Sequence, residues 1–342
     1  MTAKLIVSTA LVLASALSAA AQTEPTIRLH ANRIVDGTGK VLENATVVVR
    51  GSKITAIETG SSAPATYDLK QLTLMPGLID THVHIGWHFG KDGRMDNTGE
   101  TPGQQALYAV ENLYQTLMAG FTTVQSVGSP QDVELREATA RGIIPGPRVL
   151  TSIRQLNENS GGPDDLRTAV RKFKADGADL VKIFASKSIR DGGTQTMTAA
   201  QLDAVCGEAK AQGLRTMVHA HAASAIKDAV NAGCTQIEHG TFVDDEALKL
   251  MASKGVYFDP NIGVVLQNYL SNKPRFLGIG NYNEEGFAYM EKGLALNAAM
   301  IKKAMATPGL KIVMGTDAVA GAHGHNVNEL VERVKQGGQL SL

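Results

Sequence analysis

From Asp80 onwards the chain alternates between short apolar runs and longer stretches with helical periodicity, and this alternation limits its fold more than any other feature. Helices are predicted at residues 101–118, 132–141, 164–176, 198–212, 223–232, 245–254, 284–306 and 327–335. Apolar runs lie at residues 121–127, 147–150, 177–184, 214–219, 234–239, 255–259 and 310–317, after a first run that ends at His84. Such runs suit strands of a parallel sheet that is covered on both faces. Eight strands with intervening helices predict an α/β fold, specifically a (β/α)8 TIM barrel, over residues 76–342.

The stretch before this alternation has the pattern of β structure without helices. Thr26–His30 alternates in polarity, residues 45–50 are rich in β-branched side chains, and turns are expected at residues 35–39 and 51–53. Residues 22–75 are therefore predicted to form a small β subdomain with antiparallel strands.

The first residues have the pattern of a signal peptide over residues 1–21. Lys4 supplies the positive charge, residues 5–17 form a short apolar run, and small residues precede Gln22. The alternative, a membrane anchor, fits less well because a spanning helix needs about 20 apolar residues. We expect a secreted or periplasmic protein with no membrane association after signal removal.

The balance of charges limits the classes of partner that the chain is expected to bind. The chain has 33 basic and 33 acidic residues and a formal net charge of +0, so nothing favours nucleic acid or an anionic membrane. A small-molecule substrate is expected, and a homo-oligomer is left open.

Cys206 and Cys234 allow a disulfide, although two buried thiols are the expected state.

Residues that bind metals recur at the predicted strand ends. His82 and His84 are two apart, so they point the same way from one strand. Lys182 lies in the fourth strand, His219 and His221 end the fifth, His239 ends the sixth and Asp317 ends the eighth. Barrel active sites lie at the carboxyl ends of the strands, so these side chains are expected to converge. Either His219 or His221 could be the fifth-strand ligand, because both point the same way.

Lys182 lies inside the apolar run Leu180–Phe184. One interpretation is a lysine whose ammonium extends to solvent. A buried unpaired ammonium is costly, however. A neutral lysine can react with carbon dioxide to give a carbamate, an anionic ligand that can bridge two metals, and we expect this form.

These residues and the sequence segments around them resemble the amidohydrolase superfamily, in its imidazolonepropionase-like and prolidase-like branch. The resemblance covers residues 26–326 and rests on the segments GLIDTHVH, GFTTVQSVG, GADLVKI, MVHAHA, AGCTQIEHG and GTDAVAGAHG. It implies that His82, His84 and Asp317 hold a buried metal, that His219 and His239 hold a more exposed one, and that carboxylated Lys182 bridges them. Zinc is expected, with manganese, cobalt and iron as alternatives. A metal-bridging hydroxide would be the nucleophile, with Asp317 as general base and acid, and His239 is the other predicted catalytic residue.

Other polar residues are candidates for substrate contact. His221 and the loop residues His323 and His325 are predicted to face the substrate. Arg190 could pair with a substrate carboxylate, although a solvated surface position is expected. Gln125-Ser126 replaces an Arg-Asp pair common in the branch, and the segment 151–163 is short. The chain also looks truncated after residue 335, so that the β subdomain is expected to be incomplete.

The leading function is hydrolysis of a C-N amide or peptide-type bond in a dipeptide, an N-acyl amino acid or a cyclic amide. A lactone or phosphoester hydrolase using the same site is one alternative. An exported metal-binding protein without activity is another.

Overall fold

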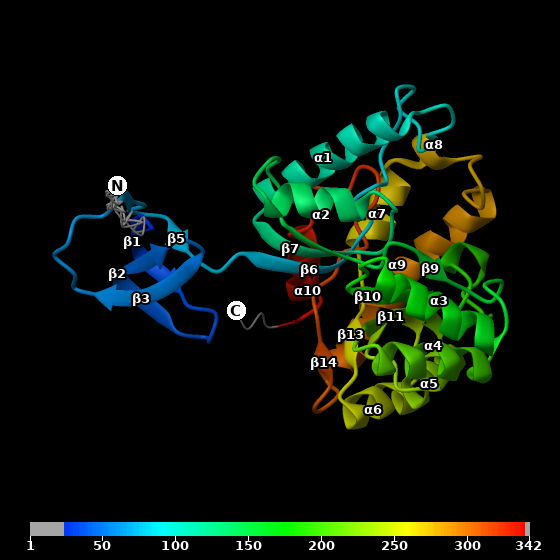
Figure 1. Ribbon diagram of the computed structural model, residues 1–342. Helices are drawn as coiled ribbons and strands as arrows, with labels where there is room; N and C mark the ends of the chain where they lie inside the picture. The colour runs from blue at the N-terminus through cyan, green and yellow to red at the C-terminus, as the bar shows by residue number, and fades with distance from the viewer. Residues whose placement is uncertain (1–23, 339–342) are drawn as a thin grey trace, which may run out of the picture. The chain divides into compact units, whose positions relative to one another are not determined.

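The computed structural model describes residues 24–338, so the predicted signal peptide lies outside the described residues. The chain divides into two compact units, one ending at Pro76 and the other beginning at Gly77 (Figure 1).

The smaller unit is a five-stranded sheet. Its strands are β1 (Thr26–Val35), β2 (Val41–Arg50), β3 (Lys53–Thr59), β4 (Tyr67–Asp68) and β5 (Thr73–Leu74). The first three pair antiparallel, as predicted, but β4 and β5 pair with β1 in parallel, which corrects the uniformly antiparallel expectation. Parallel pairing arises because the chain crosses back over residues 60–66 before β4 instead of turning tightly. Ala31, Ile34, Ala45 and Val47 form its buried core.

The larger unit alternates strands and helices, which confirms the predicted α/β class. Its strands are β6 (Leu78–Val83), β7 (Phe121–Ser126), β8 (Arg148–Thr151), β9 (Gln155–Leu156), β10 (Leu180–Phe184), β11 (Arg215–Ala222), β12 (Gln236–Phe242), β13 (Tyr257–Asp259) and β14 (Lys311–Ile312). Its helices are α1 (Pro102–Met118), α2 (Asp132–Ala140), α3 (Pro163–Ala175), α4 (Ala199–Ala211), α5 (Ala223–Asn231), α6 (Asp245–Lys254), α7 (Val264–Ser271), α8 (Lys273–Phe276), α9 (Glu284–Met305) and α10 (Asn328–Lys335), with a 3-10 turn η1 (Ile189–Asp191). Within residues 24–338, every helix is too short or too polar to cross a bilayer.

The strands form two parallel sheets, in the orders β6-β7-β8 and β14-β13-β12-β11-β10-β9. Backbone hydrogen bonds connect the two sheets. At one edge Asp179 N donates to Thr151 O over 2.8 Å. At the other, β6 lies beside the segment after β14, where Asp317 N donates to His82 O over 2.8 Å. The strand predicted up to Asp317 is regular only at Lys311–Ile312, because its later residues bond to β6 with irregular backbone.

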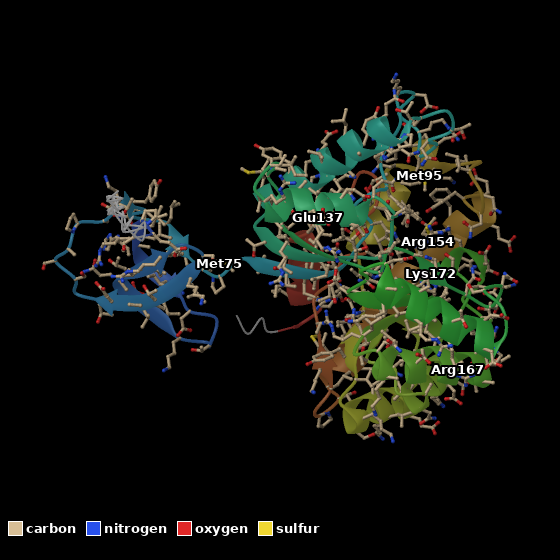
Figure 2. All side chains as sticks on the ribbon, in the orientation of Figure 1. Met75, Met95, Glu137, Arg154, Arg167 and Lys172 are labelled. Carbon is tan, nitrogen blue, oxygen red and sulfur yellow. A yellow bond between two sulfur atoms is a disulfide. The ribbon has the colours of Figure 1, made fainter. Side chains whose placement is uncertain are left out.

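The helices cover the strands with their apolar sides. In α3, Leu166, Val170 and Phe173 are buried, whereas Arg167 and Lys172 lie on the outer side (Figure 2). Helices α3 to α6 follow one another along one side of the unit (Figure 1). Local sequence sets the starts of α1 and α4, where Thr101 and Thr198 form capping boxes with Gln104 and Gln201.

Cys206 of α4 and Cys234 of the turn before β12 form a disulfide, which corrects the expectation of two buried thiols. Both residues lie in the main apolar core of the unit. The prediction was wrong because 28 residues separate the cysteines, and only the packing of α4 beside this turn brings their Cα atoms to 5.1 Å.

Candidate metal centre and active site

One cavity of about 110 Å³ contains every predicted metal-binding residue. Its lining includes His82, His84, Lys182, His219, His221, His239 and Asp317. These side chains come from β6, β10, β11, β12 and the segment after β14, all at the carboxyl ends of the strands. Convergence at this edge is therefore what parallel strands with histidines at their ends produce.

The first cluster surrounds Asp317. Its Oδ1 lies 3.1 Å from His84 Nε2 and 3.3 Å from His82 Nε2. His239 joins this cluster, because His82, His239 and Asp317 offer ligand atoms within 4.8 Å of one another. Lys182 Nζ is 3.3 Å from the same ring nitrogen, His82 Nε2.

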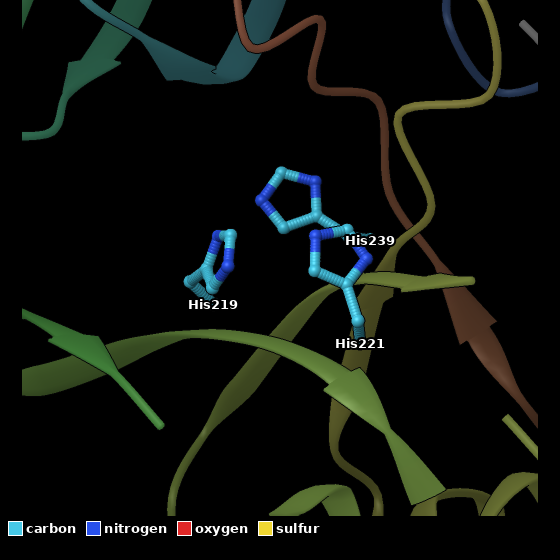
Figure 3. Close-up of side chains that lie close together, drawn as sticks. All are labelled: His219, His221 and His239. Atoms are coloured by element: carbon cyan, nitrogen blue, oxygen red, sulfur yellow. The ribbon is translucent and has the colours of Figure 1, made fainter. Parts of the chain in front are cut away.

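The second cluster is a group of three imidazoles from β11 and β12. His219, His221 and His239 offer nitrogens within 4.8 Å of one another (Figure 3). The His219 and His239 ring centroids are 4.5 Å apart, and those of His221 and His239 are 4.9 Å apart. His239 belongs to both clusters. The structure brings both His219 and His221 to the cavity, so the fifth-strand ligand is not restricted to one of them.

A hydrogen-bond chain behind His221 orients its ring. Thr241 Oγ1 donates to Asn297 Oδ1 over 2.9 Å, so its single proton is already used. The contact of 3.0 Å between His221 Nδ1 and Thr241 Oγ1 therefore needs Nδ1–H as donor. His221 then keeps its lone pair on Nε2, where it can accept a proton or bind a metal.

Burial favours the neutral form of four of these imidazoles. Burial, with a smaller contribution from neighbouring cations, lowers the pKa of His82, His219 and His239 well below 6.5. Burial first, and then the positive charge of Arg190, lowers the pKa of His221 to about 3. Neutral rings present the lone pairs that divalent metals require.

Glu238 is a residue of this site that the sequence analysis missed. It is fully buried on β12 and forms an ion pair with Lys182, which is 1% exposed. Burial raises the pKa of Glu238 to about 7, although the Lys182 charge acts in the opposite direction. Glu238 Oε1 and His82 Nδ1 are 3.4 Å apart, and neither has a hydrogen-bond partner among residues 24–338. A charged residue inside the apolar strand segment QIEHG was the available signal.

Unusual backbone positions several cavity residues. His239, Asn261 and Asp317 have φ values of 70°, 45° and 53°, in the left-handed region that non-glycine residues rarely adopt. Such conformations persist only where the surroundings hold them, and they concentrate at functional sites.

Asp80 holds the segment that carries Asp317. Its carboxylate accepts hydrogen bonds from Thr316 N at 3.0 Å, from Thr316 Oγ1 at 2.6 Å and from Asn326 Nδ2 at 2.7 Å. Burial raises the pKa of Asp80 to about 6, against the effect of these hydrogen bonds. The sequence analysis did not identify Asp80, because Thr316 and Asn326 are more than 230 residues away from it.

Three predicted positions need correction. His323 is buried outside the cavity, with Nε2 3.2 Å from the His84 carbonyl, so it supports β6 instead of facing a substrate. His325 is exposed, in a separate shallow depression beside α7. Arg190, expected at a solvated surface, lines the cavity. Neither Gln125-Ser126 nor the segment 151–163 lines it.

The arrangement matches a known family. The model of the amidohydrolase family matches residues 73–340. This chain belongs to the amidohydrolase family. The chain is a hydrolase that acts on carbon–nitrogen bonds. The resemblance stated from the sequence is thereby confirmed.

Individual amidohydrolases resemble the chain over most of its length. Ochratoxinase of Aspergillus niger is 24% identical over 363 residues, which cover 92% of this chain and 73% of that enzyme. A solved Xaa-Pro dipeptidase with bound methionine in its active site is 29% identical, with a TM-score of 0.80 over 93% of this chain and 85% of the other. The solved structure of A. niger ochratoxinase, at 22% identity, has a TM-score of 0.78 over 92% of this chain and 81% of that one, which shows a shared fold.

Divalent metal ions fit the residues of this site. Neutral imidazole nitrogens and a carboxylate are the ligands that zinc and similar metals bind. Two donor clusters that share His239 lie in one cavity, and the Nε2 atoms of His82 and His84 both lie within 3.3 Å of the Asp317 carboxylate. Metal binding is therefore consistent with both the family and the geometry.

Proposed function

We propose that this chain is a binuclear metal-dependent amidohydrolase that cleaves an amide or peptide-type bond in a small molecule. The observation that carries the proposal is the pair of donor clusters, His82-His239-Asp317 and His219-His221-His239, in one cavity beside Lys182. We further propose that the strands of the larger unit close into the predicted (β/α)8 barrel. Hydrogen bonds between β6 and the segment after β14 support this closure.

The cluster around Asp317 would hold one metal, with His82 and His84 as its other ligands. His219 and His239 would hold the second metal, with His221 as the alternative ligand from β11. Lys182, as a carbamate formed with carbon dioxide, would bridge the two. Zinc is the metal we propose, because imidazole and carboxylate ligands suit it.

When bound, the metals supply Lewis-acid activation of water and polarise the amide carbonyl. Asp317 would accept the proton of the attacking water and deliver it to the leaving nitrogen, so that the amine departs in neutral form. Its carboxylate is suited to this role because it is 15% exposed on the cavity side and faces His84. His221, with its lone pair on Nε2, would accept a hydrogen bond from the substrate.

The substrate class proposed is a dipeptide, an N-acyl amino acid or a cyclic amide. Xaa-Pro dipeptidase, by its name, acts on a dipeptide, and this supports the first of these. Apolar walls formed by Trp87, Phe184, Val265 and Leu266 suit a small hydrophobic group.

The test combines metal analysis with a substrate panel. About two metals per chain and amide hydrolysis that chelation abolishes are expected. Hydrolysis of lactones or phosphoesters without any amide cleavage would favour the alternative chemistry. A folded protein that binds no metal and cleaves nothing on the panel would contradict the proposal.

A further inference from the structure

Arg190 is a cavity residue that the proposed hydrolysis does not use. It lies in η1, the 3-10 turn after β10, where Ser188 caps the turn by accepting a hydrogen bond from Arg190 N. The turn packs closely on α9, since a Cβ on Gly286 would come within 3.2 Å of Arg190 Cβ. Gly193, in the loop after η1, lies against His221, where an added Cβ would be only 2.7 Å from the His221 Cβ. The loop that carries Arg190 therefore packs both on α9 and on His221, one of the imidazoles of the proposed metal centre.

Neighbouring side chains hold the Arg190 guanidinium in one orientation. Its Cζ lies 4.1 Å from the centroid of the Tyr282 ring and 5.4 Å from that of Tyr269. Arg190 Nε donates to Asn281 Oδ1 over 3.0 Å, and Asn281 in turn donates to Asp191. Stacking on an aromatic ring and one fixed hydrogen bond reduce the entropy that the side chain loses when it binds a ligand.

The two terminal nitrogens of this guanidinium are available to a ligand. Within residues 24–338, Nε is the one side-chain nitrogen of Arg190 with a hydrogen-bond partner, and no carboxylate lies within 4.0 Å of the group. The acidic residue that lines the cavity, Asp317, interacts with His82 and His84 instead. A half-buried positive charge with two free donors that lines a cavity is suited to bidentate binding of a carboxylate.

We propose that Arg190 binds the free carboxylate of the substrate and selects acyclic N-acyl amino acids or dipeptides over cyclic and carboxyl-blocked amides. The inference rests on the proposed function and names its substrate class. Ile189, Val265, Leu266 and Tyr269 line the same cavity, so the amino acid released carries an apolar side chain. Arg190 and the proposed metal ligands line one cavity, so a carboxylate at Arg190 and an amide at the metal centre can belong to one small molecule.

The experiment compares matched ligands that differ in one group. N-acetyl-leucine and N-acetyl-leucinamide are measured with the metal-loaded protein for hydrolysis and, by calorimetry, for binding, in wild type, Arg190→Gln and Arg190→Lys. We expect wild type to favour the free acid, and Arg190→Gln to lower its kcat/KM and its affinity roughly 100-fold, with less than about 3-fold change for the amide. Arg190→Lys should retain part of the preference, because lysine keeps the positive charge but lacks the two parallel N–H donors of the guanidinium.

Arg275 supplies the matched control. Its guanidinium also stacks on an aromatic ring, 3.3 Å from the Phe89 centroid, and donates through Nε, but it lies outside the cavity. Arg275→Gln should retain the preference for the free acid. Equal losses on both ligands in Arg190→Gln, the same change in Arg275→Gln, or no preference in wild type would overturn the inference.

Failure of the proposed function has a different signature. If neither ligand is hydrolysed, calorimetry still decides the role of Arg190, because binding of the free acid is measured without turnover. Arg190-dependent binding then supports the carboxylate site, and binding that ignores the substitution rejects it.

Discussion

Lys182 and Glu238 are both buried next to His82, and their contact links β10 to β12. A buried ion pair contributes little stability by itself, because removing both charges from water costs several kcal/mol. Its retention in the centre of the fold is better explained by chemistry at the site. Conversion of Lys182 to a carbamate would replace the ammonium with an anionic metal ligand.

Lys182→Ala should lose most of the bound metal and at least about 100-fold in kcat, because the bridging ligand is missing. Metal content by elemental analysis and hydrolysis of an N-acyl amino acid measure both effects. Bicarbonate with a short-chain carboxylic acid should restore part of the activity by occupying the space left by the side chain. Lys172→Ala, on the exposed side of α3, is the matched control and should behave as wild type. Full activity in Lys182→Ala would contradict a bridging role.

At the scale of elements, the disulfide Cys206–Cys234 attaches α4 to the turn before β12, the strand that carries His239. It closes a loop of 28 residues in sequence separation. Closing a loop of this size restricts the unfolded chain and stabilises the folded state by about 3 kcal/mol.

The double variant Cys206→Ser with Cys234→Ser should therefore lose about 3 kcal/mol in free energy of unfolding. Urea unfolding of wild type, of the variant and of wild type with reductant measures the change. The metal ligands are not altered, so metal content at 20 °C should match wild type in the folded variant. Equal stability of all three samples would show that this bridge does not constrain the chain.

Helix α10 supports the cavity from outside through Glu329. The Glu329 carboxylate accepts hydrogen bonds from Ile262 N at 2.7 Å and from Val264 N at 3.2 Å, where the chain enters α7. Val265 and Leu266 of α7 line the cavity. Burial raises the pKa of Glu329 above its ordinary value of 4.5.

Glu329→Gln should cost about 1–3 kcal/mol, because an amide nitrogen would replace one acceptor oxygen beside these donors. The cost should also depend on pH. Since the pKa of Glu329 is higher in the folded protein, its favourable contribution is complete below pH 4.5 and declines as pH rises through the folded-state value. The difference in unfolding free energy between wild type and Glu329→Gln should thus shrink as the pH rises above 4.5. A difference that grows with pH would contradict the direction of this pKa shift.

For the whole molecule, metal binding and folding should be coupled. The donors of the two clusters come from strands spread over residues 82–317, and they meet only in the folded chain. A ligand that binds the folded state alone stabilises it by about 4 kcal/mol at 1,000 times its Kd.

Removal of metal by a chelator should therefore lower the Tm, and addition of zinc should restore it. Circular dichroism at a fixed protein concentration measures the shift. Lys182→Ala serves as the control, since it should show a smaller shift with the same chelator. An identical Tm in the metal-loaded and metal-free wild type would argue against a metal centre assembled by the fold.

Local patterns determined the elements of this protein and the types of its site residues. Apolar runs and capping residues such as Thr101 and Thr198 are readable because they act within a few neighbours. Histidines at strand ends predicted the cavity, since parallel strands place their carboxyl ends together. The segment 260–283, which forms α7 and α8, has no comparable pattern.

Tertiary structure alone decided the rest. The Lys182–Glu238 pair, the Asp80–Thr316 hydrogen bonds and the Cys206–Cys234 bridge join residues 56, 236 and 28 positions apart. The sequence favours a surface position for Arg190. In the folded chain, however, the ring of Tyr282 packs against its guanidinium. No local pattern encodes such contacts, because burial and pairing depend on which distant elements pack together. The sequence thus determined which residues could bind metal, and packing determined which charges surround them.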